Sequence, residues 1–258
     1  MAQHQRRPGD ARVEGSGSGF KWVLILIAVL GVAGIGYSIW SSKGGTAATG
    51  PVTIDPTGIA GQAAPVRKGA SNAPVQIVEF ADYQCPGCAH FGTNVSRPIR
   101  EAFVDSGLVR FEYYDYPIYS AHPHAFLAAR AARCAGEQDR YWEMHDVLYT
   151  RQQQWSIDRT PPVERFVEYA GMVGADAGEF EACLQSDRFA DVVTANGMLG
   201  DQLGIRSTPT VFINGQNVGE AWSSFEDMSR LIRQQLAAAG ATGAASSDTG
   251  AAGDTATR

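Results

Sequence analysis

A short apolar strand that leads into a Cys-Pro-Gly-Cys motif most constrains how this chain can fold. Residues 75–80 (Val-Gln-Ile-Val-Glu-Phe) are mostly β-branched and apolar, which is typical of a central strand covered on both faces. The motif follows at residues 85–88, where a helical pattern of apolar residues begins. Pro86 suits the first turn of that helix, because its missing N–H would have no partner there. The two cysteines therefore lie at a strand-to-helix junction.

This junction favours a reactive thiol at Cys85. The unpaired N–H groups and the dipole of a helix N-terminus stabilise a thiolate, so we expect Cys85 to be the nucleophile. Cys88 follows three residues later, on the same face of the helix and within bonding reach. It can attack a mixed disulfide at Cys85 and release the partner protein. The spacing thus predicts a redox-active dithiol.

Three other interpretations compete for the Cys-x-x-Cys pair: half of a zinc site, a purely structural disulfide, and an accidental spacing. Zinc normally takes four ligands, whereas Cys134 and Cys183 are isolated and none of the five histidines completes a finger spacing. A bridge across three residues closes a loop too small to stabilise much through chain entropy. We therefore expect redox chemistry at this pair, with no metal and no cofactor.

The N-terminal part of the chain contains a candidate membrane anchor. Residues 22–40 are 19 residues without a charge, nearly long enough at ~1.5 Å per residue to cross a ~30 Å hydrocarbon core. Positive residues are concentrated before this run, which predicts that residues 1–21 are cytoplasmic and that the catalytic domain is extracytoplasmic. The alternative is a cleaved signal peptide, but the run exceeds the usual apolar core of about 7–15 residues. We expect a single-pass membrane protein.

Composition separates one globular domain from its flanks. Residues 41–68 are rich in Gly, Ala, Thr and Pro and predict a flexible linker, and residues 241–258 predict a disordered tail. Residues 69–240 remain as the domain. A net charge of −6 and a pI near 5.4 leave no basic stripe for a phosphate backbone, so we expect no nucleic-acid partner.

Helical periodicity dominates the middle of the domain. A helix is expected from Pro86 to about Ser106, with a kink at Pro98, and a second strand at residues 108–114. From about residue 120 to 204 the period is helical throughout, which predicts an insertion of four or five helices. Start signals for these helices lie at Ser120, at residues 160–162, at Asp176 with Glu179, and at Asp187.

Two further elements complete the domain. Residues 209–218 predict a β-hairpin, because Asn214-Gly215 supplies the positive φ angles of a type I′ turn. A last helix is expected to begin near Ser223, with Glu226 completing a capping box. The resulting order is β-α-β, then the helical insertion, then β-β-α.

Five segments of the domain carry a family resemblance. They are residues 78–80 (Val-Glu-Phe), 82–88 (Asp-Tyr-Gln-Cys-Pro-Gly-Cys), 131–135 (Ala-Ala-Arg-Cys-Ala), 141–146 (Tyr-Trp-Glu-Met-His-Asp) and 207–215 (Ser-Thr-Pro-Thr-Val-Phe-Ile-Asn-Gly). Residues from about 70 to 240 resemble the DsbA-type thioredoxin family, specifically its exported bacterial branch with an N-terminal anchor. The resemblance implies an α/β fold of the thioredoxin type with a helical insertion, and transfer of disulfides to exported proteins.

The resemblance also implies roles for single residues. Pro209, after Thr208, matches the family's cis-proline, which faces the dithiol and presents backbone for pairing with a substrate peptide. Glu79 matches a buried acid that the family uses to shuttle the proton of the second cysteine; the alternative is a carboxylate that reaches solvent at a strand end. One departure is that neither residue between the cysteines is histidine, which strongly oxidising members often carry there. Gly87 supplies no positive charge to a thiolate, so the oxidising strength stays open.

Cys134 and Cys183 lie in separate segments of the insertion. We expect a structural disulfide between them, whose loop of about 50 residues would be worth about 4 kcal/mol in the chain-entropy description. Two alternatives stay open. The residues are either two free buried thiols, or a second redox pair that exchanges electrons with Cys85 and Cys88.

The leading functional hypothesis is an oxidase that gives its disulfide to exported proteins with free thiols. By resemblance, a quinone-linked membrane partner of the DsbB or vitamin K epoxide reductase type would reoxidise it. A disulfide reductase or isomerase would have the same fold and differ in the resting state of the dithiol. An isomerase usually adds a dimerisation module, which the linker does not offer, so we expect a monomer. A non-enzymatic alternative is an anchored copper or assembly chaperone that uses Cys-x-x-Cys as soft ligands.

Overall fold

The computed structural model describes the backbone of residues 59–248 and the side chains of residues 61–240. The expected membrane anchor at residues 22–40 lies outside this range, as do the N-terminal segment and most of the expected linker. Within residues 59–248, no helix is both long and apolar enough to cross a bilayer.

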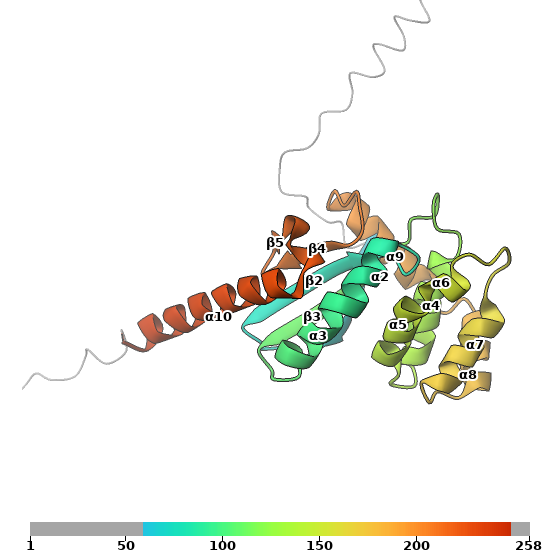
Figure 1. The fold of residues 1–258 in the computed structure, drawn as a ribbon, viewed down its shortest axis with the longest axis horizontal. Coiled ribbons are helices and arrows are strands. Elements are labelled where there is room, and N and C mark those ends of the chain that lie inside the picture. The colour runs from blue at the N-terminus through green and yellow to red at the C-terminus, as the bar shows by residue number, and fades with distance from the viewer. Residues whose placement is uncertain (1–58, 249–258) are drawn as a thin grey trace, which may run out of the picture. The chain divides into compact units, whose positions relative to one another are not determined.

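A five-stranded mixed sheet lies at the centre of the domain (Figure 1). β2 (Val75–Ala81) is the middle strand, parallel to β3 (Val109–Asp115) and antiparallel to β4 (Thr210–Ile213). The edge strands are β1 (Val66–Lys68), beside β3, and β5 (Gln216–Asn217), beside β4. The two strands and the hairpin that the sequence predicts are confirmed, with ends that differ by about one residue.

The sheet begins earlier in the chain than the expected linker boundary. A 3-10 helix, η2 (Ile59–Gln62), and strand β1 both fall within residues 41–68. Two of the three residues of β1 are charged, so its sequence has no hydrophobic alternation that would indicate a strand. The side chain of Arg67 in β1 forms an ion pair with Glu112 of β3, at 3.0 Å.

The first long helix, predicted from residue 86 to about 106, is a continuous run of four segments. α-Helical turns in α2 (Pro86–Phe91) and α3 (Arg97–Ile99) alternate with π-helical turns in η3 (Gly92–Ser96) and η4 (Arg100–Val104). A Cβ atom at Gly92 would lie 2.6 Å from the ring of Tyr149, so only glycine permits this close packing. The predicted apolar stripe is buried and consists of Phe91, Val95, Ile99 and Phe103.

The insertion contains six helices rather than the four or five predicted. The additional helix is a single turn, too short for a helical period to reveal it. The start signal at Asp176 is confirmed, because its side chain accepts the N–H of Glu179 at 2.8 Å. The helices are α4 (Ala125–Gly136), α5 (Tyr141–Thr150), α6 (Gln152–Trp155), α7 (Val163–Met172), α8 (Ala177–Gln185) and α9 (Ala190–Gln202).

Two of the predicted helix starts are wrong. The start expected at Ser120 is displaced to Ala125, because the Asp82 carboxylate accepts the N–H of Ile118 and holds the preceding residues as a loop. The start expected at Asp187 is also displaced. This residue has a left-handed φ of 54°, and α9 begins only at Ala190.

The hairpin turn and the last helix follow the sequence more closely. Asn214 and Gly215 have φ angles of 48° and 79°, as a type I′ turn requires. α10 (Phe225–Asp248) is capped by Ser224, whose hydroxyl accepts the N–H of Asp227 at 3.2 Å. The cap predicted at Ser223 is therefore one residue too early. α10 also continues into residues 241–258, where we expected a disordered tail.

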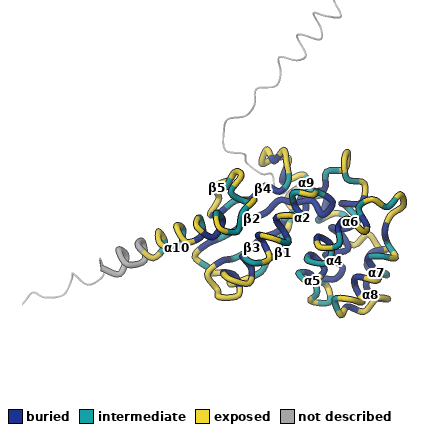
Figure 2. The backbone as a smooth tube through the Cα atoms, viewed as in Figure 1, coloured by how far each residue is buried: buried dark blue, intermediate teal, exposed yellow. Residues whose placement is uncertain are grey.

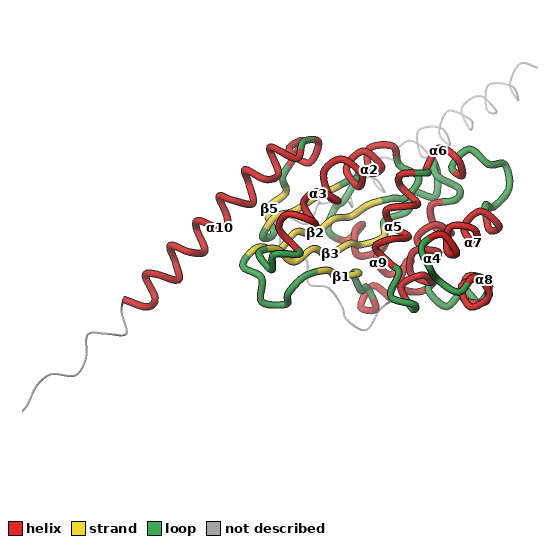
Figure 3. The backbone as a smooth tube through the Cα atoms, turned by 60° about the horizontal axis from the view of Figure 1, so that its bottom comes forward, coloured by secondary structure: helices red, strands yellow, loops and turns green. Residues whose placement is uncertain are grey.

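Helices cover both faces of the sheet (Figure 3), and the buried residues form one core (Figure 2). Successive side chains of β2 point to opposite faces. Phe80 faces α9, where a Cβ atom at Gly200 would lie 3.4 Å from its ring. Glu79 pairs in register with Tyr113 of β3 on the other face, and the Tyr113 hydroxyl contacts that of Tyr149 on α5. The sheet thus places Glu79 between β3 and the helices that follow the dithiol.

A disulfide joins two helices of the insertion. Cys134 of α4 and Cys183 of α8 are bonded, with Sγ atoms 2.07 Å apart and Cα atoms 5.8 Å apart. Both residues are buried, at 2% and 3% exposure, so a dissolved reductant has little access to either sulfur. The structure therefore shows no free thiols at this pair, and its role as a stabilising rather than redox-active bond stays a prediction.

We expect the double change Cys134→Ala with Cys183→Ala to lower the free energy of unfolding by roughly 2–5 kcal/mol, because the bond closes a long loop in the unfolded chain. Urea unfolding measures this loss. Thiol–disulfide exchange at Cys85, assayed well below the melting temperature, should be unchanged. Loss of exchange at undiminished stability would instead make the pair part of an electron relay.

Candidate active site

The structure places the two cysteines of the motif in very different surroundings. Cys85 is the N-cap of α2, with an extended backbone (φ −72°, ψ 125°), and Pro86 occupies the first turn, as the sequence predicts. Cys85 is half-buried, whereas Cys88 is fully buried. Both are free thiols, so the structure shows the reduced state of this pair.

Hydrogen bonds from the start of α2 stabilise the thiolate of Cys85. The largest effect is a hydrogen bond from the Cys88 thiol, with smaller effects from Thr208 and from the N–H groups of Cys88 and Gly87. Partial burial acts in the opposite direction, because it disfavours the charged form. Together they lower the pKa of Cys85 to about 5. Cys85 is therefore a thiolate at neutral pH.

The pKa of Cys88 shifts in the opposite direction. Its side chain is 0% exposed, and burial raises its pKa well above the usual range. The negative charges of Cys85 and Glu79 add to this increase, and the backbone N–H of Asp82, 3.5 Å from Sγ, opposes it. Cys88 thus keeps its proton while Cys85 loses its own, which makes the two thiols chemically unequal.

The loop before β4 lies against the dithiol. The carbonyl oxygen of Thr208 is 3.4 Å from Sγ of Cys85, and the Thr208–Pro209 peptide bond is cis. A Cβ atom at Gly87 would lie 3.4 Å from Cδ of Pro209 and 3.7 Å from the ring of Trp222. The structure therefore brings Thr208 and Pro209 beside the thiolate, and their role in pairing with a substrate peptide stays a prediction.

Glu79 lies deep in the sheet below the dithiol. Its side chain is 0% exposed, so it does not reach solvent at the strand end. Neither carboxylate oxygen has a hydrogen-bond partner among the described residues. Burial raises the pKa of Glu79 to about 8, although the positive charge of Arg100 opposes this shift. Glu79 is therefore largely protonated at neutral pH.

Asp82 supports the dithiol in a way that the sequence did not reveal. Its Oδ1 accepts the N–H of Gln84 at 2.6 Å, and its Oδ2 accepts the N–H of Ile118 at 2.7 Å. The same Oδ2 lies 2.8 Å from Nδ1 of His122. Asp82 thus joins the strand end before Cys85 to the loop before α4. The only sequence signal for this role was that Asp82 is a polar residue within the segment of residues 82–88.

Two glutamines complete the support. Gln84 donates to the carbonyl of Ser156 at 2.7 Å and accepts the N–H of His124 at 2.8 Å. Gln152 donates from Nε2 to the carbonyls of Tyr83, at 2.8 Å, and Cys85, at 2.9 Å. No sequence signal points to Gln152, because it lies far along the chain in the one-turn helix α6.

Fold and site together define a class, namely a thioredoxin-type domain whose Cys-x-x-Cys pair lies at a helix N-terminus beside a cis-proline. The family model for thioredoxin matches residues 62–234. The chain therefore belongs to the thioredoxin family, and its fold is of the DsbA type. The family resemblance of the sequence is confirmed.

Individual proteins show how far the similarity extends. The crystal structure of alpha-DsbA1 from Wolbachia pipientis superposes with a TM-score of 0.62 at 19% identity, covering 69% of this chain and 94% of that one. Disulfide bond formation protein D of Bacillus subtilis is 24% identical over 176 residues, which is 65% of this chain and 75% of that protein. The Na(+)/H(+) antiporter NhaA 3 of Salinispora tropica is 34% identical over 149 residues, 58% of this chain. This match spans only 21% of the antiporter's length.

The structure predicts that the low pKa of Cys85 depends on the thiol of Cys88. Cys88→Ala removes the strongest hydrogen bond, so the pKa of Cys85 should rise from about 5 toward the usual range. Cys88→Ser keeps a donor and should leave the pKa close to that of the unaltered protein. Thiolate absorbance at 240 nm, followed across pH in the reduced proteins, measures both.

The N–H donors of the helix remain in both variants and provide the comparison. If the Cys88→Ala protein titrates at the same pH as the unaltered protein, the helix N-terminus alone sets the pKa of Cys85. The assigned contribution of the Cys88 thiol would then be wrong.

Proposed function

We propose that this chain is an extracytoplasmic thiol–disulfide oxidoreductase that oxidises exported proteins through Cys85 and Cys88. The observation that carries the proposal is the asymmetry of the pair, in which Cys85 has a pKa of about 5 and buried Cys88 keeps its proton. A stabilised thiolate is a good leaving group, and it stabilises the reduced form of the pair. The disulfide between them is therefore oxidising. Similarity to disulfide bond formation protein D supports the same assignment.

The reaction consists of two exchanges. A substrate thiolate attacks Sγ of Cys85, the Cys85–Cys88 bond breaks, and Cys88 leaves as a thiolate that takes up one proton. A second substrate thiolate then attacks the substrate sulfur of the mixed disulfide, and Cys85 leaves as a stable thiolate. The substrate loses two electrons and gains a disulfide, and the Cys85–Cys88 pair gains the two electrons.

Glu79 is the proposed proton donor for Cys88. The carboxyl group is buried near Cys88 closely enough for its charge to raise the pKa of that thiol. Because its own pKa is about 8, Glu79 holds a proton at neutral pH and can give it to the Cys88 thiolate. During reoxidation the carboxylate would take the proton back.

Thr208 and Pro209 are the proposed binding residues for the substrate backbone. The carbonyl of Thr208 lies beside the sulfur that substrate attacks, and Thr208 is only partly buried. An extended peptide that hydrogen-bonds there would place its cysteine next to Cys85. Binding through backbone atoms suits a protein that acts on many sequences.

The proposed location and partner rest on the sequence. Residues 22–40 would anchor the chain in the membrane, with the described domain outside the cytoplasm. A quinone-linked membrane partner would then reoxidise the protein, and the domain would act as a monomer.

A phosphatase reporter fused after Arg67 should be active, because that enzyme folds only outside the cytoplasm. An inactive fusion would contradict this location.

The trapping of substrates tests the roles of the two cysteines. Cys88→Ser leaves Cys85 able to attack a disulfide but removes the thiol that resolves the product, so mixed disulfides with exported proteins should accumulate. Non-reducing gels of cells treated with an alkylating agent measure them. Cys85→Ser and the double serine variant should trap far less.

Three outcomes would change the assignment. More trapping by Cys85→Ser than by Cys88→Ser would reverse the roles of the cysteines. If the same alkylation shows that the Cys85–Cys88 pair is reduced in growing cells, the protein is a reductase or isomerase. Stoichiometric Cu(I) binding without any disulfide exchange would favour the metal chaperone.

A further inference from the structure

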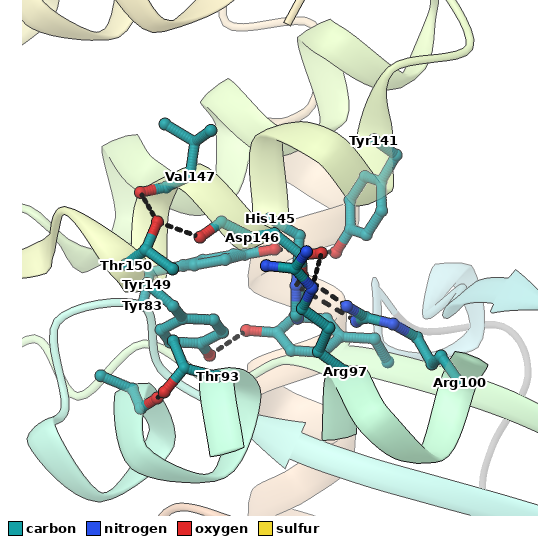
Figure 4. A network of polar contacts seen from close by, with 12 residues as sticks. Tyr83, Thr93, Arg97, Arg100, Tyr141, His145, Asp146, Val147, Tyr149 and Thr150 are labelled. Atoms are coloured by element: carbon teal, nitrogen blue, oxygen red, sulfur yellow. Dashed lines mark hydrogen bonds and ion pairs between the residues drawn. The ribbon is translucent and has the colours of Figure 1, made fainter. Parts of the chain in front are cut away.

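A buried histidine of α5, His145, lies among aromatic side chains that include Tyr83, Tyr141 and Tyr149 (Figure 4). Its side chain is 0% exposed. Its Nε2 is buried and has no hydrogen-bond partner among the described residues. A cage of five rings surrounds the imidazole at centroid distances of 4.9–6.3 Å, namely those of Tyr83, Tyr113, Tyr141, Trp142 and Tyr149.

The hydroxyl groups of this cage form two pairs. Those of Tyr83 and Tyr141 are 3.1 Å apart, and those of Tyr113 and Tyr149 are 2.8 Å apart. Either hydroxyl of each pair can be the donor, so each pair has two orientations. Burial raises the pKa of all four tyrosines well above the usual range, which keeps them neutral. A neutral hydroxyl accepts one proton and gives up another without holding a charge.

The surroundings of Nδ1 accommodate both neutral tautomers of His145. Nδ1 lies 3.0 Å from Oδ1 of Asp146, which accepts a hydrogen bond when Nδ1 carries the proton. It also lies 3.3 Å from Nη1 of Arg100, which donates when Nδ1 carries none. The proton can therefore move between Nδ1 and Nε2 without leaving Nδ1 unpaired. Burial lowers the pKa of His145 to about 4, so the ring is neutral at the working pH.

The outer end of this group reaches the surface at Asp146. The side chain of Asp146 is 25% exposed and pairs with the guanidinium of Arg100. Both residues line a surface cleft, together with Arg97 and Trp142. Although burial raises the pKa of Asp146, the hydrogen bonds and charges of His145 and Arg100 lower it overall, so Asp146 reaches solvent as a carboxylate, whereas His145 behind it does not reach solvent.

The inner end lies at Glu79. Glu79 is paired in register with Tyr113, and its charge raises the pKa of Tyr113, Tyr141 and Tyr149. Among the residues that the structure describes, neither of its carboxylate oxygens has a hydrogen-bond partner, and the same holds for Nε2 of His145. Unpaired buried polar atoms are costly, so their presence near the tyrosines requires an explanation.

We propose that His145 relays protons between Asp146 at the surface and the Glu79–Cys88 pair, by way of the tyrosine hydroxyls. The unpaired atoms are the points at which the relay closes during the reaction. The proposal rests on the proposed function, and it concerns the route that a proton takes rather than the exchange of sulfur bonds.

Reoxidation of the reduced protein shows why such a route is required. The Cys85 thiolate attacks glutathione disulfide, forms a mixed disulfide and releases one glutathione thiolate. Cys88 must then lose its proton, attack the mixed disulfide and release the second glutathione thiolate, so that the two glutathione thiolates together carry away the two electrons. Glu79 holds a proton in the reduced protein and can accept that of Cys88 only after passing its own proton outward. One proton therefore leaves the buried site in each oxidation and enters it in each reduction.

A purely structural role is the competing explanation. The charged and titratable groups packed against His145 are Asp146, Tyr141 and Tyr149 on its own helix, Arg100 on the first helix, Tyr83 before the dithiol and Tyr113 on the sheet. If His145 only packs between them, its replacement should disturb stability or the Cys85 thiolate. It should not selectively slow the step that deprotonates Cys88.

His145→Asn provides the test, because its amide retains a donor near the position of Nδ1 but has nothing at that of Nε2. Reduced protein is mixed with glutathione disulfide, quenched in acid and analysed by mass spectrometry. Formation of the mixed disulfide at Cys85 should keep its rate. Its resolution by Cys88 should slow by roughly tenfold or more and acquire a larger solvent isotope effect in D₂O.

Two tyrosine variants keep the test decisive if His145→Asn does not fold. Tyr113→Phe and Tyr149→Phe each remove one hydroxyl of the Tyr113–Tyr149 pair without changing the ring. Both variants should slow resolution of the mixed disulfide by Cys88. Tyr169→Phe is the matched control. The hydroxyl of this buried tyrosine bonds Gln154 outside the cage, so its loss should have no effect on resolution.

Resolution at the unaltered rate in a folded His145→Asn protein, or equal slowing of both steps, would overturn the relay. Absence of any mixed disulfide at Cys85 in the unaltered protein would instead overturn the proposed function. The two failures are therefore distinguishable in one experiment.

Discussion

The hydrogen bonds that hold the Cys85 thiolate are the interaction on which the site depends. They come from the thiol of Cys88 and N–H groups at the start of α2, and from Thr208, so they require two segments of chain to meet at one sulfur. β2 delivers Cys85 to the helix N-terminus, and β4, its neighbour in the sheet, brings the loop with Thr208 beside it. Asp82, Gln84 and Gln152 then fix the backbone around the motif. The fold thus surrounds one sulfur atom with hydrogen-bond donors.

The low pKa of Cys85 arises without a histidine between the cysteines. Gly87 contributes only its N–H group, and the absence of a side chain lets Pro209 and Trp222 approach closely. A neutral set of donors can stabilise a thiolate because partial burial strengthens each hydrogen bond. The low pKa of Cys85 therefore depends on the position of Cys88 and of Thr208, not on a positive charge in the motif.

Local patterns were sufficient to predict the parts of the fold that depend on local physics. The central strand, the helix after Cys85 and the Asn214-Gly215 turn were all evident, because periodicity and turn chemistry are set by near neighbours. β1 and the one-turn helix α6 were missed because their stability comes from pairing and packing with distant residues. The displaced start of α4 has the same origin, since Asp82 holds its preceding loop from 36 residues away.

The site shows the same division between local and distant interactions. Cys85 and Cys88 were found from their spacing, and Glu79, Thr208 and Pro209 only through a family resemblance. Nothing in the sequence could show that Glu79 lies without a hydrogen-bond partner among residues 61–240, or that His145 is enclosed by tyrosines. Both facts result from long-range packing, which brings β2, β3 and α5 together.

The opposite pKa shifts of Cys85 and Glu79 define the pH range in which the site can work. Cys85, whose pKa is lowered to about 5, contributes stability to the reduced protein that is lost as pH falls through that value. Glu79, whose pKa is raised to about 8, contributes stability that is lost as pH rises through that value. Between about 5 and 8 their effects on stability oppose each other. Only in this range do a Cys85 thiolate and a protonated Glu79 coexist, which is the combination that the proposed exchange reaction requires.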